Sequence, residues 1–370
     1  MHLPDRATVL VAAGGTGGHL FPAEALGAAL AKRGVAAHLA TDRRAARYGG
    51  AFADDAVHVV ASATLRGRDP LALAKTAAAL GRGLVQSWVL IGRLEPAAVV
   101  GFGGYPTIPP VLAATWRGVP TLIHDANAVI GRANRFLAPR VTAIATTFAD
   151  VFDDRPDLGA KATLTGNPVR QAVVAAAATP YPPSSDPLRL LVFGGSQGAR
   201  VMADVVPGAI RQLEPGLRAR LAIVQQAREE DVAGVRAAYS DLPVAAEVAP
   251  FFADLPARMA ASHLIVSRSG ASTVAELAAI GRPAILVPLP HAIDQDQFAN
   301  AGVLERAGGA VRLAQEQFTP RRLAAEIGAL VARPGRLAAM AAAARSTGRL
   351  DAADRLAKLV LTVAGIEPSK

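Results

Sequence analysis

The stretch Val266-Ser267-Arg268-Ser269-Gly270-Ala271-Ser272-Thr273-Val274-Ala275-Glu276 is the part of the sequence around which the fold can be predicted. It predicts the end of a buried strand over 263–267, a turn of small residues, and a helix that ends before Gly281. A helix start favours an anion, and small side chains let a phosphate approach its backbone N–H groups. Glu276 is placed to accept hydrogen bonds from two neighbouring hydroxyls, such as those of a ribose. A simpler interpretation stays open, because Thr273 and Glu276 also have the spacing of a capping box.

Three more glycine-rich turns follow predicted strands, at 14–18, 101–104 and 194–198. A strand, a glycine turn and a helix in this order form the usual cradle for a phosphate. The first turn is not the dinucleotide fingerprint, because Leu20 stands where the third glycine belongs, and this argues against a dehydrogenase. It is not a Walker loop either. A helix is expected after this turn, from about Phe21 to Arg33. His19 precedes it, either near a bound anion or as a surface or capping histidine.

Strands and helices alternate along both halves of the chain, which predicts an α/β fold with two doubly wound parallel sheets. The strands expected in the first half are 8–13, 36–40, 57–61, 97–101, 121–124 and 141–146. Those expected in the second half are 188–193, 221–225, 244–248, 263–266 and 284–287. The Pro- and Ser-rich stretch 179–187 is the predicted linker. Two such domains would form a cleft between their strand ends.

The composition limits the classes of protein to which the chain can belong. The chain has 370 residues, 51% of them hydrophobic and 19% charged, and no cysteine, which excludes disulfides and cysteine-bound metal. No apolar run reaches the roughly 18 residues of a membrane span. The net charge of +9 is spread evenly, with 17 basic against 12 acidic residues over 1–167 (+5) and 22 against 18 over 168–370 (+4). With only 5% aromatic residues and no basic cluster, we expect no nucleic-acid partner.

The apolar residues of 70–93 have the spacing of an amphipathic helix, because they recur every three or four residues. Basic residues lie nearby. The spacing by itself favours packing against the core. The flanking cations, together with Trp88 and Trp116, keep open a second interpretation, in which this surface lies on a membrane.

The motifs taken together resemble the MurG glycosyltransferases, and the resemblance covers about residues 8–360. It is carried by Gly14-Gly-Thr-Gly-Gly-His19, Gly103-Gly104-Tyr105, Gly166-Asn-Pro-Val-Arg170, Gly194-Gly-Ser-Gln-Gly198, Ser267-Arg-Ser-Gly270 with Glu276, and the segment Asp294 to Asn300. It implies the GT-B fold, with two Rossmann-like domains facing across a cleft. Residues 1–167 would form an acceptor-binding, membrane-associated domain, 168–350 a domain that binds UDP-N-acetylglucosamine (UDP-GlcNAc), and helix 351–366 would pack back on the first.

The resemblance also implies roles for single residues. Phe252 would hold the uracil through its backbone, Glu276 the ribose hydroxyls, and Gln297 with Asn127 the sugar. The remaining contacts to UDP-GlcNAc would come from glycine turns, a helix start and one arginine: Thr16, Gly17, Gly18, Arg170, Ser196, Ala271, Ser272, Thr273, Val274 and Ala275. The implied partners are UDP-GlcNAc, lipid I, and the cytoplasmic face of the inner membrane, contacted peripherally through 70–93 and Trp116.

The implied reaction is an inverting transfer of N-acetylglucosamine to the 4-hydroxyl of the muramoyl sugar in lipid I, which gives lipid II. A base must take the hydroxyl proton. His19 is the first candidate and Asp125 the second. The chain reads His124-Asp125-Ala126-Asn127 where the family commonly reads His-Glu-Gln-Asn, which puts a catalytic role of this segment in doubt. No Asp-x-Asp signature is expected in the cleft, so we expect no obligatory metal or cofactor.

Other functions are compatible with the same fold. A diacylglycerol glucosyltransferase or a UDP-GlcNAc 2-epimerase is the nearest alternative, and the epimerase would turn over a UDP-sugar without any lipid. A non-catalytic nucleotide-binding protein is an alternative from a different class. Release of UDP that depends on a lipid I analogue would exclude it.

Overall fold

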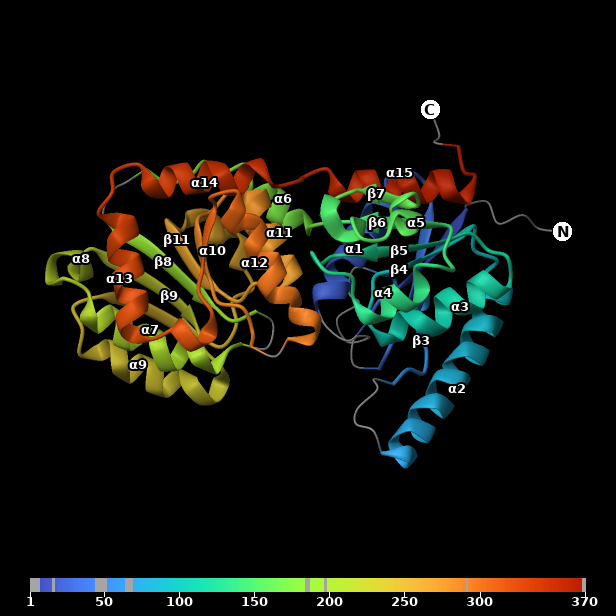
Figure 1. Cartoon of the computed structure of the whole chain (residues 1–370), viewed down its shortest axis with the longest axis horizontal. Helices are drawn as coiled ribbons and strands as arrows, with labels where there is room; N and C mark the ends of the chain where they lie inside the picture. Colours follow the sequence, from blue (N-terminus) through green and yellow to red (C-terminus); the bar gives the residue numbers. More distant parts are fainter. Residues whose placement is uncertain are drawn as a thin grey trace. The chain divides into compact units, whose positions relative to one another are not determined.

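The computed structural model describes residues 7–14, 17–43, 52–63, 69–183, 187–195, 198–290 and 292–367 (Figure 1). The chain divides into two compact units, each with its own sheet. Unit 1 comprises residues 1–170 and 350–370, and unit 2 comprises residues 171–349. The predicted α/β class with two parallel sheets is therefore confirmed.

Unit 1 contains a parallel seven-stranded sheet in the order β3-β2-β1-β4-β5-β6-β7. The strands are β1 (Thr8–Ala12), β2 (Ala36–Thr41), β3 (Val57–Val59), β4 (Ala98–Gly101), β5 (Thr121–Asp125), β6 (Ala143–Thr146) and β7 (Ala162–Leu164). The helices are α1 (Gly17–Ala31), α2 (Pro70–Leu94), α3 (Ile108–Trp116), α4 (Arg132–Leu137), α5 (Pro156–Gly159) and α15 (Ala352–Ala364), with short 3-10 turns η2 (Asp54–Ala56), η3 (Tyr105–Thr107) and η4 (Ala149–Phe152).

Helices cover both faces of this sheet, which explains why its central strands β1 and β4 carry apolar residues on both faces rather than on alternate ones. Val9 and Val11 of β1 pack with α1 and with Leu356 and Val360 of α15. The alternate residue Leu10 faces the opposite core, which includes side chains of α2, α3 and α4. Helix α15 thus comes from the far end of the chain to pack against α1.

Unit 2 contains a parallel six-stranded sheet in the order β10-β9-β8-β11-β12-β13. The strands are β8 (Leu188–Phe193), β9 (Leu221–Gln226), β10 (Ala245–Ala249), β11 (Leu264–Ser267), β12 (Ala284–Leu286) and β13 (Ala310–Arg312). The helices are α6 (Gln171–Ala176), α7 (Arg200–Gln212), α8 (Pro215–Ala219), α9 (Val232–Ser240), α10 (Leu255–Ala261), α11 (Ala271–Ile280), α12 (Asp296–Arg306), α13 (Pro320–Val331) and α14 (Arg336–Ser346), with 3-10 turns η5 (Glu229–Asp231), η6 (Ile293–Gln295) and η7 (Gln315–Gln317).

The stretch predicted as a linker lies inside unit 2, so that prediction is wrong over its described residues. Tyr181 donates to the carbonyl of His263 at 2.9 Å. The guanidinium of the buried Arg282 donates to the carbonyls of Thr179 and Pro180 at 3.1 and 2.9 Å. Proline and serine mark irregular backbone, but this irregular segment is held down by hydrogen bonds to its carbonyls.

Residues 70–94 form one helix, α2, which lies along the edge of unit 1 beside α3 (Figure 1). The predicted core packing applies to Ile91, which is buried, and only partly to Leu80 and Leu84. The prediction of core packing is wrong for Leu73 and Trp88, whose side chains are exposed. The helix therefore uses one side for the core and leaves apolar side chains on another side in contact with solvent.

Candidate functional site

The order of the strands brings the glycine turns together in pairs. In unit 1 the order reverses between β1 and β4, where Ala12 lies opposite Gly101. In unit 2 it reverses between β8 and β11, where Phe193 lies opposite Ser267. The turns that leave each pair of strands are therefore neighbours at the carboxyl edge of the sheet. Open α/β sheets bind ligands at this position.

The second glycine turn of unit 1 is covered by the ring of His19. Gly103 and Gly104 have φ values of +88° and +75°, which other residues rarely adopt. A Cβ atom built on either residue would lie only 3.4–3.6 Å from atoms of the imidazole ring. These distances are ordinary van der Waals contacts, so the positive φ values, and not a clash with His19, make a side chain unfavourable there. The ring of His19 packs directly on this turn.

His19 lies in the first turn of α1, which begins at Gly17 and not near Phe21 as predicted. Gly17 and Gly18 are consequently helical residues. His19 is half-buried, and its Nδ1 has no hydrogen-bond partner among the described residues. Burial lowers the pKa of His19, an effect that the backbone of Phe102 partly opposes. The imidazole is therefore neutral at pH 7 and able to accept a proton.

A second histidine, His124, lies fully buried at the end of β5. Its Nε2 is 3.0 Å from the carbonyl oxygen of Gly166, and its ring centroid is 5.3 Å from that of Phe102. The pKa of His124 is lowered to about 4, mainly by burial and to a smaller extent by the nearby His19, while the hydrogen bond to Gly166 acts in the opposite direction. His124 is thus a neutral side chain that ties β5 to the Gly166 turn.

The carboxylate of Asp125 is buried and accepts hydrogen bonds from the loop that follows it and from helix α4. Its Oδ1 accepts from the backbone N–H of Asn127 at 3.0 Å. Its Oδ2 accepts from the N–H of Gly131 and from Nδ2 of Asn134, each at 2.9 Å. This carboxylate organises the 126–131 loop and the start of α4. Asn127, predicted to contact the sugar, is held in this loop by its backbone and is half-buried.

Arg170 ends the first of the two segments of unit 1, and its guanidinium carbon lies 4.3 Å from the ring centroid of Phe21. Both side chains lie beside the first turns of α1. Glu24 lies on the same helix, and its charge interacts with that of Arg170. Burial raises the pKa of Glu24, and the positive charge of Arg170 lowers it by a smaller amount. Arg170 is thus placed by a cation–π contact beside the glycine start of α1.

In unit 2, the predicted nucleotide residues 271–276 all lie in α11, which begins at Ala271. The capping box is wrong, because Gly270 is the N-cap and Thr273 lies inside the helix. Glu276 therefore lies in the second turn of α11, not the first. Its side chain is buried, as is that of Val274, so Val274 can reach a ligand only through its backbone. Ala271, Ser272, Thr273 and Ala275 are half-buried.

The loop after β12 is tied to this helix start by several hydrogen bonds. Ser269 donates to the carbonyl of Gln297 at 2.8 Å, and Asn300 donates to the carbonyl of Ser269 at 3.3 Å. The side-chain oxygen of Gln297 accepts from the N–H of Leu289 at 3.0 Å. The amide nitrogen of Gln297 then remains as the group that can donate to a ligand. Asp294, with φ +58°, adopts left-handed backbone, which costs energy and is concentrated at functional sites.

Sequence reasoning gave no role to two residues that position these loops. Gln226 ends β9; its Oε1 accepts from the N–H of Gly194 at 3.3 Å, and its Nε2 donates to the carbonyl of Pro250 at 3.1 Å. It thereby joins the glycine turn after β8 to the segment that leads to Phe252. The buried Arg268 donates to the carbonyls of Val287 and Pro288 at 3.1 and 3.0 Å. A polar residue at the carboxyl end of an apolar strand was the available signal for both.

Phe252 is buried, and Arg258 lies 4.3 Å above its ring centroid, whereas the neighbouring Phe251 is exposed. A buried ring leaves the backbone of Phe252 as the part that can meet a base. Thr16 and Ser196 lie outside the described residues. Among the described residues, no group of three or more His, Cys, Asp or Glu side chains could hold a metal ion. In the same residues, no helix is both long and apolar enough to cross a membrane.

Comparison with known proteins shows to which family the chain belongs. Residues 9–146 match the glycosyltransferase family 28 N-terminal domain, and residues 189–356 match the glycosyltransferase family 28 C-terminal domain. The chain is 66% identical over 360 residues to the UDP-N-acetylglucosamine–N-acetylmuramyl-(pentapeptide) pyrophosphoryl-undecaprenol N-acetylglucosamine transferase of Rhodopseudomonas palustris strain BisB18. This match covers 97% of the chain and 96% of the relative. The chain belongs to the MurG family.

Other members of the MurG family show the same agreement. The enzyme of the same name from Nitrobacter winogradskyi is 64% identical and covers 96% of the chain and 97% of its own length. The crystal structure of Acinetobacter baumannii MurG has a TM-score of 0.77 and 29% identity, covering 96% of this chain and 99% of that one. A UDP-GlcNAc 2-epimerase from Neisseria meningitidis, bound to UDP-GlcNAc, has a TM-score of 0.70 but only 13% identity, with 96% and 100% covered, and so shares the fold alone.

Proposed function

We propose that this chain transfers N-acetylglucosamine from UDP-GlcNAc to the muramyl sugar of a polyprenyl-pyrophosphate acceptor, lipid I. The observation that carries the proposal is full-length identity of 62–66% to enzymes named for this transfer. The paired glycine turns in each unit give independent support, because donor and acceptor both carry a pyrophosphate that such turns can hold. The reaction breaks the bond from the sugar to UDP and forms a bond to an acceptor hydroxyl oxygen.

In this proposal unit 2 binds the donor. The first N–H groups of α11 and the turn after β8 hold the diphosphate, because they place helix-start donors and glycine backbone together. Glu276, fixed in the second turn of α11, accepts from the ribose hydroxyls. The amide of Gln297 donates to the sugar, and the backbone of Phe252 holds the base. Gln226 and Arg268 are positioning residues, since they join the loops that carry these contacts.

Unit 1 then binds the acceptor and supplies the base. The neutral imidazole of His19 takes the proton from the attacking hydroxyl, which raises the nucleophilicity of that oxygen. Asp125 is a positioning residue, because each of its oxygens already accepts hydrogen bonds from the loop that holds Asn127. Arg170, packed on Phe21, offsets negative charge on the departing diphosphate.

We also propose that unit 1 contacts the cytoplasmic surface of the membrane without crossing it. Val85, Trp88 and Val89 of α2 and Trp116 at the end of α3 are exposed apolar side chains. Arg117 lies 4.3 Å above the ring of Trp88, so cationic and aromatic groups share this surface. Tryptophan with basic residues is typical of helices that lie in the membrane interface.

A transfer assay tests the function. It uses labelled UDP-GlcNAc and a lipid I analogue with a short prenyl chain, and compares the native chain with Glu276→Ala and His19→Ala. His19→Ala should lower kcat by about 10²–10⁴-fold, the usual contribution of a general base. Glu276→Ala should raise the KM for UDP-GlcNAc.

Glu214→Ala, at an exposed site of unit 2, is the matched control and should keep native kinetics. Absence of labelled product with the native chain, under conditions where UDP-GlcNAc binds, would show that the proposed reaction is wrong.

A further inference from the structure

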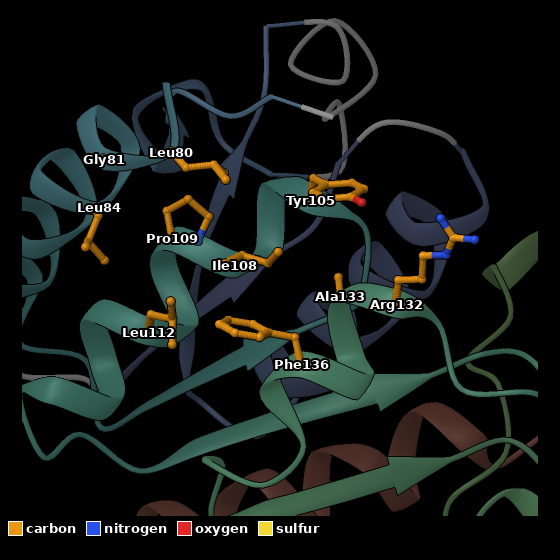
Figure 2. Close-up of a pocket in the computed structure, with 10 residues that line it drawn as sticks. All are labelled: Leu80, Gly81, Leu84, Tyr105, Ile108, Pro109, Leu112, Arg132, Ala133 and Phe136. Atoms are coloured by element: carbon orange, nitrogen blue, oxygen red, sulfur yellow. The ribbon is translucent and has the colours of Figure 1, made fainter. Parts of the chain in front are cut away.

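An apolar pocket lies within unit 1, between helices α2, α3 and α4 (Figure 2). Its volume is about 420 Å³, which is within the range of small-molecule sites. Residues of all three helices and of the turn before α3 form its walls, among them Gly81, Leu84, Tyr105, Leu112, Arg132 and Phe136. The candidate site described above uses residues next to these in the sequence, such as Gly104 and Gly131, but not the pocket residues themselves. The pocket is therefore not explained by that site.

The two polar residues of the lining lie toward one side of the pocket. Figure 2 shows Tyr105 and Arg132 on one side, with Leu84 and Leu112 on the other. Tyr105 directly follows the glycine turn Gly103–Gly104, and Arg132 directly follows Gly131, whose N–H donates to Asp125. The polar side of the pocket is therefore built from the same two segments that form the candidate acceptor site.

This arrangement matches a molecule with an anionic head joined directly to an apolar chain. The arginine and the glycine turn suit a pyrophosphate, and the remaining walls offer only apolar contact. Phospholipids of the bilayer also carry apolar chains, but they do not place a pyrophosphate next to the chain. Since 420 Å³ holds only a short segment, the chain would continue beyond the pocket.

We propose that this pocket binds the first isoprenyl units of the acceptor, next to its pyrophosphate. The inference rests on the proposed function, and it adds a binding site for the chain of the acceptor to the sites for its sugar and pyrophosphate. The pocket makes the enzyme sensitive to the part of the lipid that lies closest to the reacting sugar.

Gly81 offers a way to fill the pocket without disturbing the fold. It lies on α2 in the pocket wall, and a Cβ built on it meets no atom within 4 Å. Replacing a helical glycine also favours the helix. Gly81→Phe therefore adds a ring at the wall of the pocket without a clash at its Cβ position. Gly234→Phe is the matched control, because Gly234 lies on helix α9 of unit 2 and also has open space around its Cβ position.

The kinetic experiment uses two soluble acceptors that differ only in the group on the pyrophosphate, a ten-carbon prenyl chain or a methyl group. For the native chain we expect kcat/KM to be at least about tenfold higher with the prenyl acceptor, as for burial of apolar groups in a fitted pocket. Gly81→Phe should reduce this ratio to about twofold or less and leave the methyl acceptor unchanged. Gly234→Phe should keep the native ratio. A native ratio near one, or a ratio unaffected by Gly81→Phe, overturns the proposal.

A binding experiment separates this proposal from the proposed function. Calorimetry compares geranyl pyrophosphate with methyl pyrophosphate, so that any affinity of other sites for pyrophosphate is common to both ligands. The native chain should bind the geranyl compound more tightly, and Gly81→Phe should abolish the difference. Phe136→Asp, at a side chain that is 45% exposed, should do the same by adding charge to the wall. Chain-dependent binding without any transfer would reject the reaction but keep the pocket, whereas transfer without chain-dependent binding would reject the pocket.

Discussion

Among single residues, His124 couples the stability of unit 1 to pH. Its pKa is about 4 in the folded chain and 6.5 in the unfolded chain, so the unfolded state binds a proton first as the pH falls. The stabilisation is fully present above pH 6.5 and is lost between pH 6.5 and pH 4, and amounts to about 3 kcal/mol. His124→Gln keeps a donor for the Gly166 carbonyl but does not titrate. Urea unfolding at pH 8, 6.5, 5 and 4 should show a smaller loss of stability with acid in His124→Gln than in the native chain. Equal losses would contradict this assignment.

Replacing Asp125 should change the stability of the protein, but not the pH dependence of its activity as replacing a catalytic base would. Asp125→Asn places an amide against the donors from Gly131 and Asn134 and should lower the free energy of unfolding by about 1–3 kcal/mol. Activity should fall with stability, but the pH dependence of the remaining kcat/KM should keep its native form, because the base is still present. Asp153→Asn, at an exposed site of unit 1, should change neither quantity. A variant that folds normally and loses the acidic limb of its pH profile would identify Asp125 as the base instead.

The sequence was informative about where the candidate residues lie in the fold and less informative about what each does. The glycine motifs, Glu276 and the histidines could be identified because they stand at strand ends and helix starts. The hydrogen bonds of Asp125, and the loop-joining role of Gln226, depend on residues that are distant in sequence. The predicted capping box failed because Gly270, in extended backbone, already provides the N-cap of α11.

At the level of elements, helix α2 packs against the core on one side and exposes apolar side chains on another. Val85 and Val89 are 64% and 63% exposed, so changing them should not weaken the core. The triple variant Val85→Ser, Trp88→Ser, Val89→Ser should sediment less with anionic lipid vesicles and keep its melting temperature. Ala77→Ser and Ala78→Ser, at exposed sites of the same helix, serve as the control and should sediment like the native chain. Unchanged sedimentation of the triple variant would rule out this surface as the membrane contact.

Sequence reasoning missed two strands, β7 and β13, which are short and lie at sheet edges. β7 and β13 each have three residues and pair with one neighbour only, so neither carries a long apolar run. The central strands could be predicted to within two residues at most ends because both of their faces are buried. Helix α1 begins four residues before its predicted start, because Gly17 and Gly18 were assigned to the turn on the basis of composition.

On the scale of the whole molecule, each unit has its own core, and α15 belongs to that of unit 1. Val360→Asp places a charge among fully buried side chains, which should cost several kcal/mol. Urea unfolding should then show an early transition for unit 1, while calorimetric binding of UDP to unit 2 persists at urea concentrations above that transition. Thr362→Asp, at an exposed site of the same helix, should unfold like the native chain. Loss of UDP binding together with unit 1 would show that the units do not fold independently.

The return of α15 to unit 1 also governs how the protein is made. The apolar side of α1 is covered only after residues 352–364 have left the ribosome, although the rest of unit 1 emerges first. Synthesis of the 179 intervening residues, 171–349, takes roughly 9–36 s at usual translation rates. During that interval the nascent chain presents an uncovered apolar surface, and holding it soluble is a task for cellular chaperones until translation ends.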